Sequence, residues 1–349
     1  MSRVKFGDVV KRININVDRF NTDRLYYIGK GATIEPDALT VEPQGRINAT
    51  LGFKFHFGFN PGHILFMSRC FDQHKAATAT FYGICSDSTY VVETKDESVL
   101  LQRYLQLEMQ SDRFWRWCEE HKSGGVNYLI NYSTLETYEF TLPPIAEQKV
   151  LADKLWAAYE VKQSYLKMIE ATQEMVKSQF IEMFKGDYQT EKWEDCLSIT
   201  NGKKYDGDYQ EYGSFPICGS GGIMGYGESK FCDKDTVILG RKGNINSPIY
   251  MKNDYWIVDT AFSLAVDRQK LQPKYFYFWC KRFDFTKYNK QGVLPSLTKN
   301  DLQKIEIPIP PMELQTSFVV MLEQADKSEF ELRKSIKAID AVIKSLINS

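Results

Sequence analysis

Apolar side chains recur in alternating steps of four and three along two long segments, 145–184 and 312–347, that contain neither proline nor glycine. This spacing is typical of a heptad seam between paired helices. A helix of about forty residues is roughly 60 Å long, and a small domain cannot cover such a stripe alone. The pattern therefore predicts that the helices pair antiparallel, because a long domain separates them; two independent surface helices are the alternative. The seam positions expected at the interface are Leu151, Leu155, Lys162, Ile169, Leu322, Glu329, Ile336 and Ile343.

Each seam also contains a polar position near the middle of its helix. Lys162 and Glu329 occupy equivalent places and carry opposite charges. Polar residues at seam positions can fix the register of paired helices. We therefore expect an ion pair between Lys162 and Glu329.

The rest of the chain consists of short runs of aromatic and β-branched residues separated by glycine, asparagine and aspartate. This pattern predicts mixed, mainly β structure, with one helix expected at Glu97–Glu120. The chain is therefore expected to be an α+β protein with two domains, each followed by a long helix. The expected bounds are 1–142 and 187–309 for the domains, and 143–186 and 310–349 for the helices.

The second half of the chain repeats part of the first half at a shift of 167 positions. Gly125-Val126 aligns with Gly292-Val293 and Pro143-Pro144 with Pro310-Pro311, and the match continues into both helices without a gap. A repeat of this length indicates two similar domains rather than a solenoid. In both copies the strand before the two prolines leads directly into the helix, so each domain is expected to be held rigidly on its helix. This arrangement suits one task performed twice at a fixed distance.

Composition adds three limits to this interpretation. The net charge of −1 provides no general attraction to nucleic acid, so DNA binding would depend on local patches. Seven scattered cysteines without a C-x-x-C pair favour a reducing compartment over a disulfide framework or a zinc site. The first residues lack the apolar core of a signal peptide, and no apolar run approaches membrane-spanning length. We expect a cytoplasmic protein.

One segment, Gly219–Gly225, has the glycine content of a cofactor-binding loop. Its spacing misses G-x-G-x-x-G, because Met224 stands where the third glycine belongs, and a turn rather than a helix is expected after it. We favour a flexible loop that approaches the backbone of another molecule. A methyltransferase that binds S-adenosylmethionine in this segment is the alternative. Catalytic and metal-binding motifs with the required spacing are absent from the sequence, so we predict no catalytic residue, metal or cofactor in this chain.

Several expected loops combine basic, amide or hydroxyl side chains with glycine. Arg, Lys, Asn and Gln can bond to base edges, and Lys and Ser suit phosphates. A set of this kind in both domains predicts a DNA-binding surface. The candidate residues are Lys203, Lys204, Tyr205, Ser220, Gly221, Arg241, Lys242, Asn244, Lys290 and Gln291 in the second domain, and Lys30, Arg69, Gln73 and Lys75 in the first.

The order of sequence blocks in the second half resembles the specificity subunits of type I restriction-modification systems. The blocks are Trp193–Gly202, Tyr212–Tyr226, Asp235–Gly243, Val258–Phe262 and Ile305–Pro311. The first half is similar only in short stretches and lacks both the tryptophan and the glycine-rich block.

This resemblance implies two target-recognition domains joined by an antiparallel coiled coil, each reading one half of a bipartite DNA sequence. It also implies two methyltransferase subunits and, for cleavage, translocating nuclease subunits as partners. S-adenosylmethionine, ATP and magnesium would then bind to those partners. A protein-only coiled-coil scaffold is a further alternative.

Overall fold

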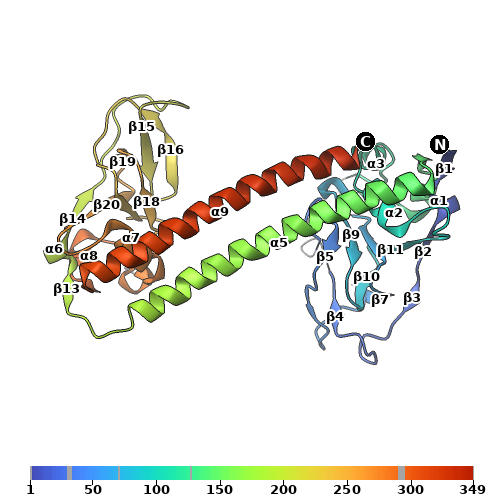
Figure 1. Cartoon of the computed structure of the whole chain (residues 1–349), viewed down its shortest axis with the longest axis horizontal. Helices are drawn as coiled ribbons and strands as arrows, with labels where there is room; N and C mark the ends of the chain where they lie inside the picture. Colours follow the sequence, from blue (N-terminus) through green and yellow to red (C-terminus); the bar gives the residue numbers. More distant parts are fainter. Residues whose placement is uncertain (1, 30–33, 70, 126–127, 290–294, 349) are drawn as a thin grey trace. The chain divides into compact units, whose positions relative to one another are not determined.

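The computed structural model describes residues 2–29, 34–69, 71–125, 128–289 and 295–348, which form two compact units. Unit 1 contains the first domain, the first part of helix α5 and the last part of helix α9 (Met1–Lys167 with Leu332–Ser349). Unit 2, Met168–Glu331, contains the rest of both helices and the second domain (Figure 1). Each unit is therefore built from one domain and one half of each long helix.

The first domain consists of two five-stranded sheets, ordered β2-β11-β8-β9-β5 and β3-β7-β10-β4-β6, and a pair β1-β12. Its elements are β1 (Ser2–Lys5), α1 (Phe6–Val9), β2 (Val10–Arg12), β3 (Ile15–Asn16), β4 (Tyr26–Tyr27), β5 (Thr40–Val41), β6 (Gly45–Arg46), β7 (Phe55–Phe59), β8 (Ile64–Met67), η1 (Phe71–Gln73), β9 (Ala76–Ala79), β10 (Gly83–Ser86), β11 (Thr89–Thr94), α2 (Gln102–Glu108), α3 (Asp112–Glu120), α4 (Tyr132–Leu135) and β12 (Glu139–Leu142).

The second domain has a four-stranded sheet, β14-β20-β17-β18, a three-stranded sheet, β16-β15-β19, and a pair β13-β21. Its elements are β13 (Thr190–Lys192), α6 (Trp193–Cys196), β14 (Leu197–Asn201), β15 (Phe215–Gly219), β16 (Gly222–Gly227), β17 (Thr236–Gly240), β18 (Ile249–Met251), β19 (Trp256–Ile257), β20 (Ala261–Val266), α7 (Pro273–Arg282), η2 (Phe285–Tyr288), α8 (Lys299–Gln303) and β21 (Glu306–Pro308).

The two domains share one plan. In each, the first and last strands pair antiparallel, and a one-turn helix follows the first strand. That helix begins with a fully buried aromatic residue, Phe6 in the first domain and Trp193 in the second. Phe6 therefore occupies the place of the tryptophan that the first half lacks.

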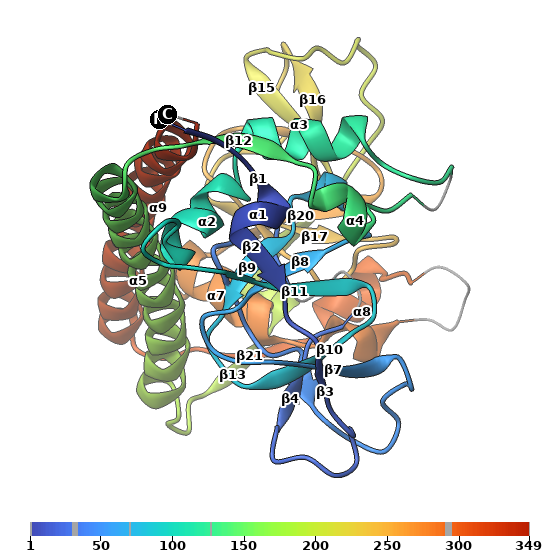
Figure 2. The same cartoon turned by 90° about the vertical axis from the view of Figure 1, so that its right-hand side faces the viewer.

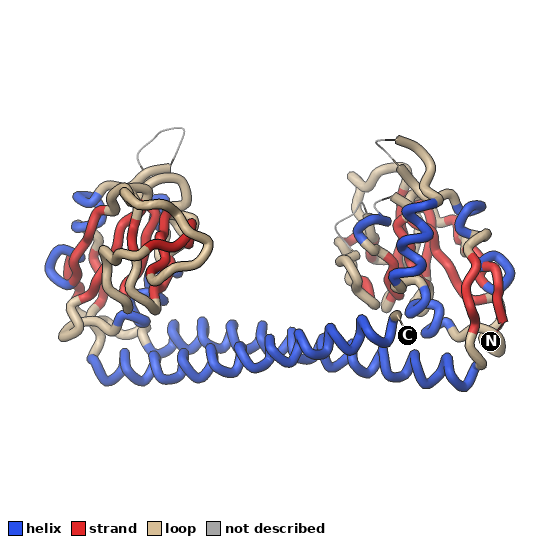
Figure 3. The backbone as a smooth tube through the Cα atoms, turned by 90° about the horizontal axis from the view of Figure 1, so that it is seen from above, coloured by secondary structure: helices blue, strands red, loops and turns tan. Residues whose placement is uncertain are grey.

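The long helices are α5 (Ile145–Met183) and α9 (Met312–Ile347), close to the predicted bounds. In unit 1, Leu155 near the start of α5 shares a core with Ile343 near the end of α9. In unit 2, Phe180 near the end of α5 shares a core with Phe318 near the start of α9 (Figure 3). The helices are antiparallel, and the predicted α+β fold with a helix pair is confirmed.

The prediction of one helix at Glu97–Glu120 is wrong, because the segment contains two helices, α2 and α3. Ser111 stands between them, where its Oγ donates to the Glu108 carbonyl at 2.7 Å and accepts from the Phe114 N–H at 3.2 Å. Local bonds of a serine side chain to the backbone compete with a continuing helix and favour a new N-terminus. The apolar spacing continues across this break and concealed it.

The glycine-rich segment is also not the predicted flexible loop. Residues Phe215–Gly227 form the hairpin β15-β16, and Ser220 and Gly221 make its two-residue turn (Figure 2). Gly222, with φ of +108°, supplies the left-handed backbone conformation that glycine adopts readily. No helix begins at this turn, so the segment lacks the strand–loop–helix geometry with which cofactor loops bind phosphates.

Candidate nucleic-acid interface

The turn Val258–Ala261, between β19 and β20, holds three of the predicted loops of the second domain together. The Thr260 carbonyl accepts from the backbone N–H groups of Arg241, at 2.8 Å, and Lys242, at 3.2 Å. The side-chain Oγ1 of Thr260 accepts from the Ser220 N–H at 3.3 Å. The Gly202 N–H donates to the Ala261 carbonyl at 3.1 Å. Segments that are up to about sixty residues apart in sequence thus meet at this turn, which residue patterns did not single out as a centre.

The Arg241 loop bends back closely on the strand that precedes it. A Cβ on Gly240 would lie 1.9 Å from the Asn244 carbonyl oxygen, so only glycine fits there. The Lys242 and Asn244 side chains are exposed, whereas Arg241 is half-buried with its guanidinium 6.0 Å from the Phe262 ring centre. Lys242 and Asn244 are therefore the members of this loop most available to a ligand.

The three side chains of the Lys203–Tyr205 segment differ in their contacts within the domain. The Lys203 ammonium lies over the rings of Phe231, at 4.2 Å, and Trp256, at 4.7 Å. Tyr205 is buried, and its hydroxyl accepts from the Glu228 N–H. Lys204 is exposed. The expectation of three exposed side chains is wrong for Tyr205, because its ring packs into the domain core.

The first domain contains the same turn, although sequence comparison did not align it. The Ser88 carbonyl accepts from the Ser68 N–H at 3.0 Å, as Thr260 accepts from Arg241. The Ser68 carbonyl accepts from the Ile130 N–H at 3.0 Å, and the Arg241 carbonyl accepts from Leu297 at 2.9 Å. The loop after Ser68 in the first domain therefore corresponds to the loop that carries Lys242 and Asn244 in the second.

The predicted residues of the first domain have different environments. Arg69 directly follows Ser68 and is exposed, as is Gln73 in η1. Lys75 is buried, with 6% of its surface exposed, and directly precedes the inner strand β9; the expectation that it projects into solvent is wrong. Lys30, Lys290 and Gln291 lie outside the described residues.

The predicted seam residues differ in burial. Leu155, Ile169 and Ile343 are buried. The Lys162–Glu329 pair, however, is wrong. Lys162 bonds to Asp340 at 2.6 Å in unit 1, and Glu329 accepts from Gln173 at 3.0 Å in unit 2. The remaining seam positions, which are all half-buried, are Leu151, Leu322 and Ile336.

The two polar contacts are equivalent under the sequence repeat. Gln173 corresponds to Asp340 at the shift of 167, as Lys162 corresponds to Glu329. Eleven residues separate the two contacts on each helix, so both contacts belong to a single antiparallel register. The two contacts follow the sequence repeat, but the centre of the helix pair lies between them rather than at Lys162 and Glu329.

One buried glutamine joins each domain to its long helix. Gln148, in the first turn of α5, accepts from the Leu101 N–H at 3.0 Å and donates to the carbonyls of Val99 and Pro143, each at 2.9 Å. Gln315, its equivalent in α9, accepts from the Gln272 N–H at 2.8 Å. It donates to the carbonyls of Lys270, at 2.9 Å, and Pro310, at 2.8 Å. One amide thus joins domain, prolines and helix in both copies.

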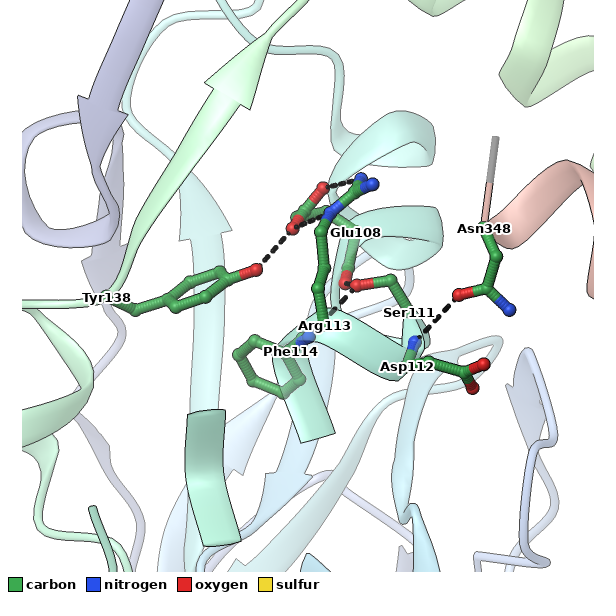
Figure 4. A network of polar contacts seen from close by, with 7 residues as sticks. All are labelled: Glu108, Ser111, Asp112, Arg113, Phe114, Tyr138 and Asn348. Atoms are coloured by element: carbon green, nitrogen blue, oxygen red, sulfur yellow. Dashed lines mark hydrogen bonds and ion pairs between the residues drawn. The ribbon is translucent and has the colours of Figure 1, made fainter. Parts of the chain in front are cut away.

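A buried carboxylate reinforces the first domain beside the end of α9 (Figure 4). Glu108 is fully buried and accepts from the Tyr138 hydroxyl at 2.6 Å and from Arg113 Nε at 3.0 Å. Burial and the Glu108 charge together raise the pKa of Tyr138, so its hydroxyl stays protonated as a donor. The Asp112 N–H donates to Asn348 Oδ1 at 2.9 Å. The helix α3 is therefore joined through Glu108 to Tyr138, which directly precedes β12, and through Asp112 to Asn348, which directly follows α9.

Burial shifts the pKa of several cysteines and of one histidine. Burial raises the pKa of Cys85, Cys196 and Cys218 to about 12, which keeps these thiols protonated and unreactive. Burial lowers the pKa of His63. Among the described residues, no three His, Cys, Asp or Glu side chains gather as metal ligands would.

Comparison with known proteins shows what the second half of the chain is similar to. Residues 185–340 match the family described as type I restriction modification DNA specificity domain. A putative type I restriction enzyme specificity subunit of Haemophilus influenzae is 26% identical over 116 residues, which are 32% of this chain and 30% of that protein. The match to this family therefore covers the second domain and most of helix α9.

Solved structures support the fold over nearly the whole chain. The specificity subunit from M. genitalium has a TM-score of 0.69 at 15% identity, covering 99% of this chain and 94% of that one. A chain from work on complex assembly and conformational transition of the type I R-M system has a TM-score of 0.58 at 15% identity, covering 99% and 96%. In the described part of this chain, no helix has the length and apolarity needed to cross a membrane.

The Gly240 contact leads to a prediction for the second domain. Gly240→Ala is expected to displace the Arg241–Asn244 loop and to lower the stability of the second unit by roughly 1–3 kcal/mol, because the new methyl group would overlap backbone. Gly221→Ala is the matched control, since a Cβ there meets no atom within 4 Å. Urea unfolding of both variants measures the difference. Equal midpoints would show that the loop accommodates the methyl group.

Proposed function

We propose that this chain is the DNA sequence-reading subunit of a type I restriction-modification complex, and that its two domains read the two halves of a bipartite site. The observation that carries the proposal is the duplication of one hydrogen-bonded turn, at Ser88 and at Thr260, with an exposed basic residue beside each. Arg69 and Lys242 are these residues. Basic side chains on a rigid scaffold are the usual means of contacting phosphates and base edges.

The mounting of the domains explains why two readers would share one chain. Gln148 and Gln315 join each domain to its helix through three hydrogen bonds with no flexible linker. A fixed mount suits recognition of two half-sites across a spacer of constant length. The near-neutral chain would leave much of the phosphate binding to partners.

The partners that fit this role are two methyltransferase subunits and, for cleavage, translocating nuclease subunits. The methyltransferase subunits would bind S-adenosylmethionine, and the nuclease subunits would use ATP and magnesium. The chemistry would then belong to the partners, and this chain would supply the choice of sequence. The hairpin geometry of Gly219–Gly225 favours this division over a methyltransferase that uses that segment.

The proposal is tested by methyl transfer to DNA with purified components. The chain alone is expected to show no transfer and weak DNA binding, and the chain with its methyltransferase subunits is expected to methylate a defined sequence. The methyltransferase subunits without this chain serve as the control and are expected to lack sequence choice. Transfer by the chain alone would refute the proposal.

A further inference from the structure

The hairpin β15-β16 exposes two large apolar side chains that are neighbours in sequence. Ile223 is 57% exposed and Met224 is 58% exposed. In a regular strand, adjacent residues point to opposite faces. Here Ile217 pairs with Gly225 but Cys218 pairs with Ile223, which leaves Met224 without a partner on β15. This is a β-bulge, a feature that bends a strand and changes the direction of its side chains.

The bulge lies next to the turn that holds the basic loop. A Cβ on Gly219 would lie 2.9 Å from Met224 Sδ and 3.0 Å from Thr260 Oγ1, so the thioether and the Thr260 hydroxyl flank the same small space. Thr260 in turn bonds to the backbone of Ser220, Arg241 and Lys242. Met224 of the apolar pair therefore lies near the threonine that holds the basic loop in place.

The shape of the hairpin limits what could cover these side chains. The turn Ser220-Gly221 carries little bulk, and a Cβ on Gly221 would meet no atom within 4 Å. The strand β16 is at the edge of its sheet. The hairpin extends beyond the third strand, β19, which pairs only with Ile217 and Cys218 of β15. A two-stranded hairpin end of this kind fits the major groove of B-DNA, where the methyl group of thymine is the apolar mark of an A·T pair. Methionine adapts well to such a contact because its side chain is unbranched and polarisable.

We propose that Ile223 and Met224 contact thymine methyl groups in the second half-site, beside polar contacts made by the Arg241–Asn244 loop. This inference rests on the proposed function and deepens it, because it assigns the apolar part of sequence discrimination to the bulge. It requires at least one A·T pair in the half-site that the second domain reads.

The test uses the full chain in complex with its methyltransferase subunits and DNA duplexes that carry the recognised sequence. Deoxyuridine replaces each thymine of the second half-site in turn, which removes only the methyl group. Loss of one buried methyl group is expected to weaken binding roughly fourfold at each contacted position. For Met224→Ala and Ile223→Ala, thymine and deoxyuridine duplexes are expected to bind almost equally at the position that the lost side chain contacted.

Two controls separate this result from general damage. Deoxyuridine in the first half-site is expected to have the same effect on the variants as on the unaltered chain. In methylation assays, both variants are also expected to recognise the first half-site as the unaltered chain does. This result would show that they fold.

Three results would overturn the inference while leaving bipartite recognition intact. These are a second half-site without A·T pairs, binding that is insensitive to every deoxyuridine, and variants that retain full dependence on the methyl groups. Variants with normal DNA binding but weak assembly with the methyltransferase subunits would assign the bulge to a protein contact and would also overturn it. If the unaltered complex shows no sequence preference at all, the proposed function itself fails.

Discussion

Replacing Arg113 by alanine is expected to destabilise unit 1 by about 3–5 kcal/mol, the usual effect of leaving a buried charge without its partner. Glu108 is fully buried, and Arg113 supplies the positive charge beside it through two hydrogen bonds. The variant would keep the Tyr138 hydroxyl as the remaining donor to the carboxylate. That single neutral donor cannot replace a guanidinium, so we expect the first domain to unfold at much lower denaturant concentration.

The matched control for this prediction is Arg116→Ala. Arg116 is on the same helix α3 and is exposed, and it forms no ion pair within the described residues. Its loss is expected to change the free energy of unfolding by less than about 0.5 kcal/mol. Urea titrations followed by tryptophan fluorescence measure both variants. Similar midpoints for the two would show that the Glu108 network does not stabilise the domain.

Lengthening both long helices by one heptad is expected to change the spacer of the recognised site and nothing else. The insertions belong after Lys167 in α5 and after Lys334 in α9, between the polar contacts Lys162–Asp340 and Gln173–Glu329. Seven residues per helix preserve the heptad seam and leave those contacts unaltered. They add about 10 Å of helix, or about three base pairs of B-DNA at 3.4 Å each.

Methylome sequencing of cells that carry the lengthened chain measures this effect. Both half-sites are expected to stay the same while the unread spacer grows by about three base pairs. Insertion of a heptad into α5 alone is the control, since it disrupts the shared register and is expected to abolish methylation. An altered half-site with an unchanged spacer would contradict the role of the helices.

The long helices could be predicted from the sequence almost to the residue, because their signals are local. Proline before the first turn, glycine after α5 and an uninterrupted seam require no knowledge of the fold. The Lys162–Glu329 pair was wrong for the opposite reason. The register of two helices depends on the whole packed seam, and the two polar residues at its centre do not determine it alone.

The first domain shows where sequence comparison by a single shift fails. Phe6 corresponds to Trp193 at a shift of 187, Asp87 to Asp259 at 172, and Ile130 to Leu297 at 167. Connections of different length separate the shared strands, so only the last part of the repeat aligns over a long stretch. The common turn is also made by backbone groups, since the Ser88 and Thr260 carbonyls accept from backbone N–H donors. Backbone hydrogen bonds of this kind leave little trace in residue identity.

Burial decided which candidate residues remain available for DNA. Tyr205 and Lys75 were selected for their chemistry, yet both are buried, and the ammonium of the exposed Lys203 lies over two aromatic rings. Arg69, Lys204, Lys242 and Asn244 have exposed side chains. The apolar pair on β16 was missed, because a bulge is a property of strand pairing and has no residue signature.

Bipartite recognition can be tested by mapping methylated bases in cells with and without this chain, in the presence of the proposed methyltransferase subunits. We expect methylation at one bipartite sequence, with two defined half-sites and an unread spacer of constant length, and we expect it to disappear when the chain is absent. A single continuous motif, or the same methylation without the chain, would contradict it.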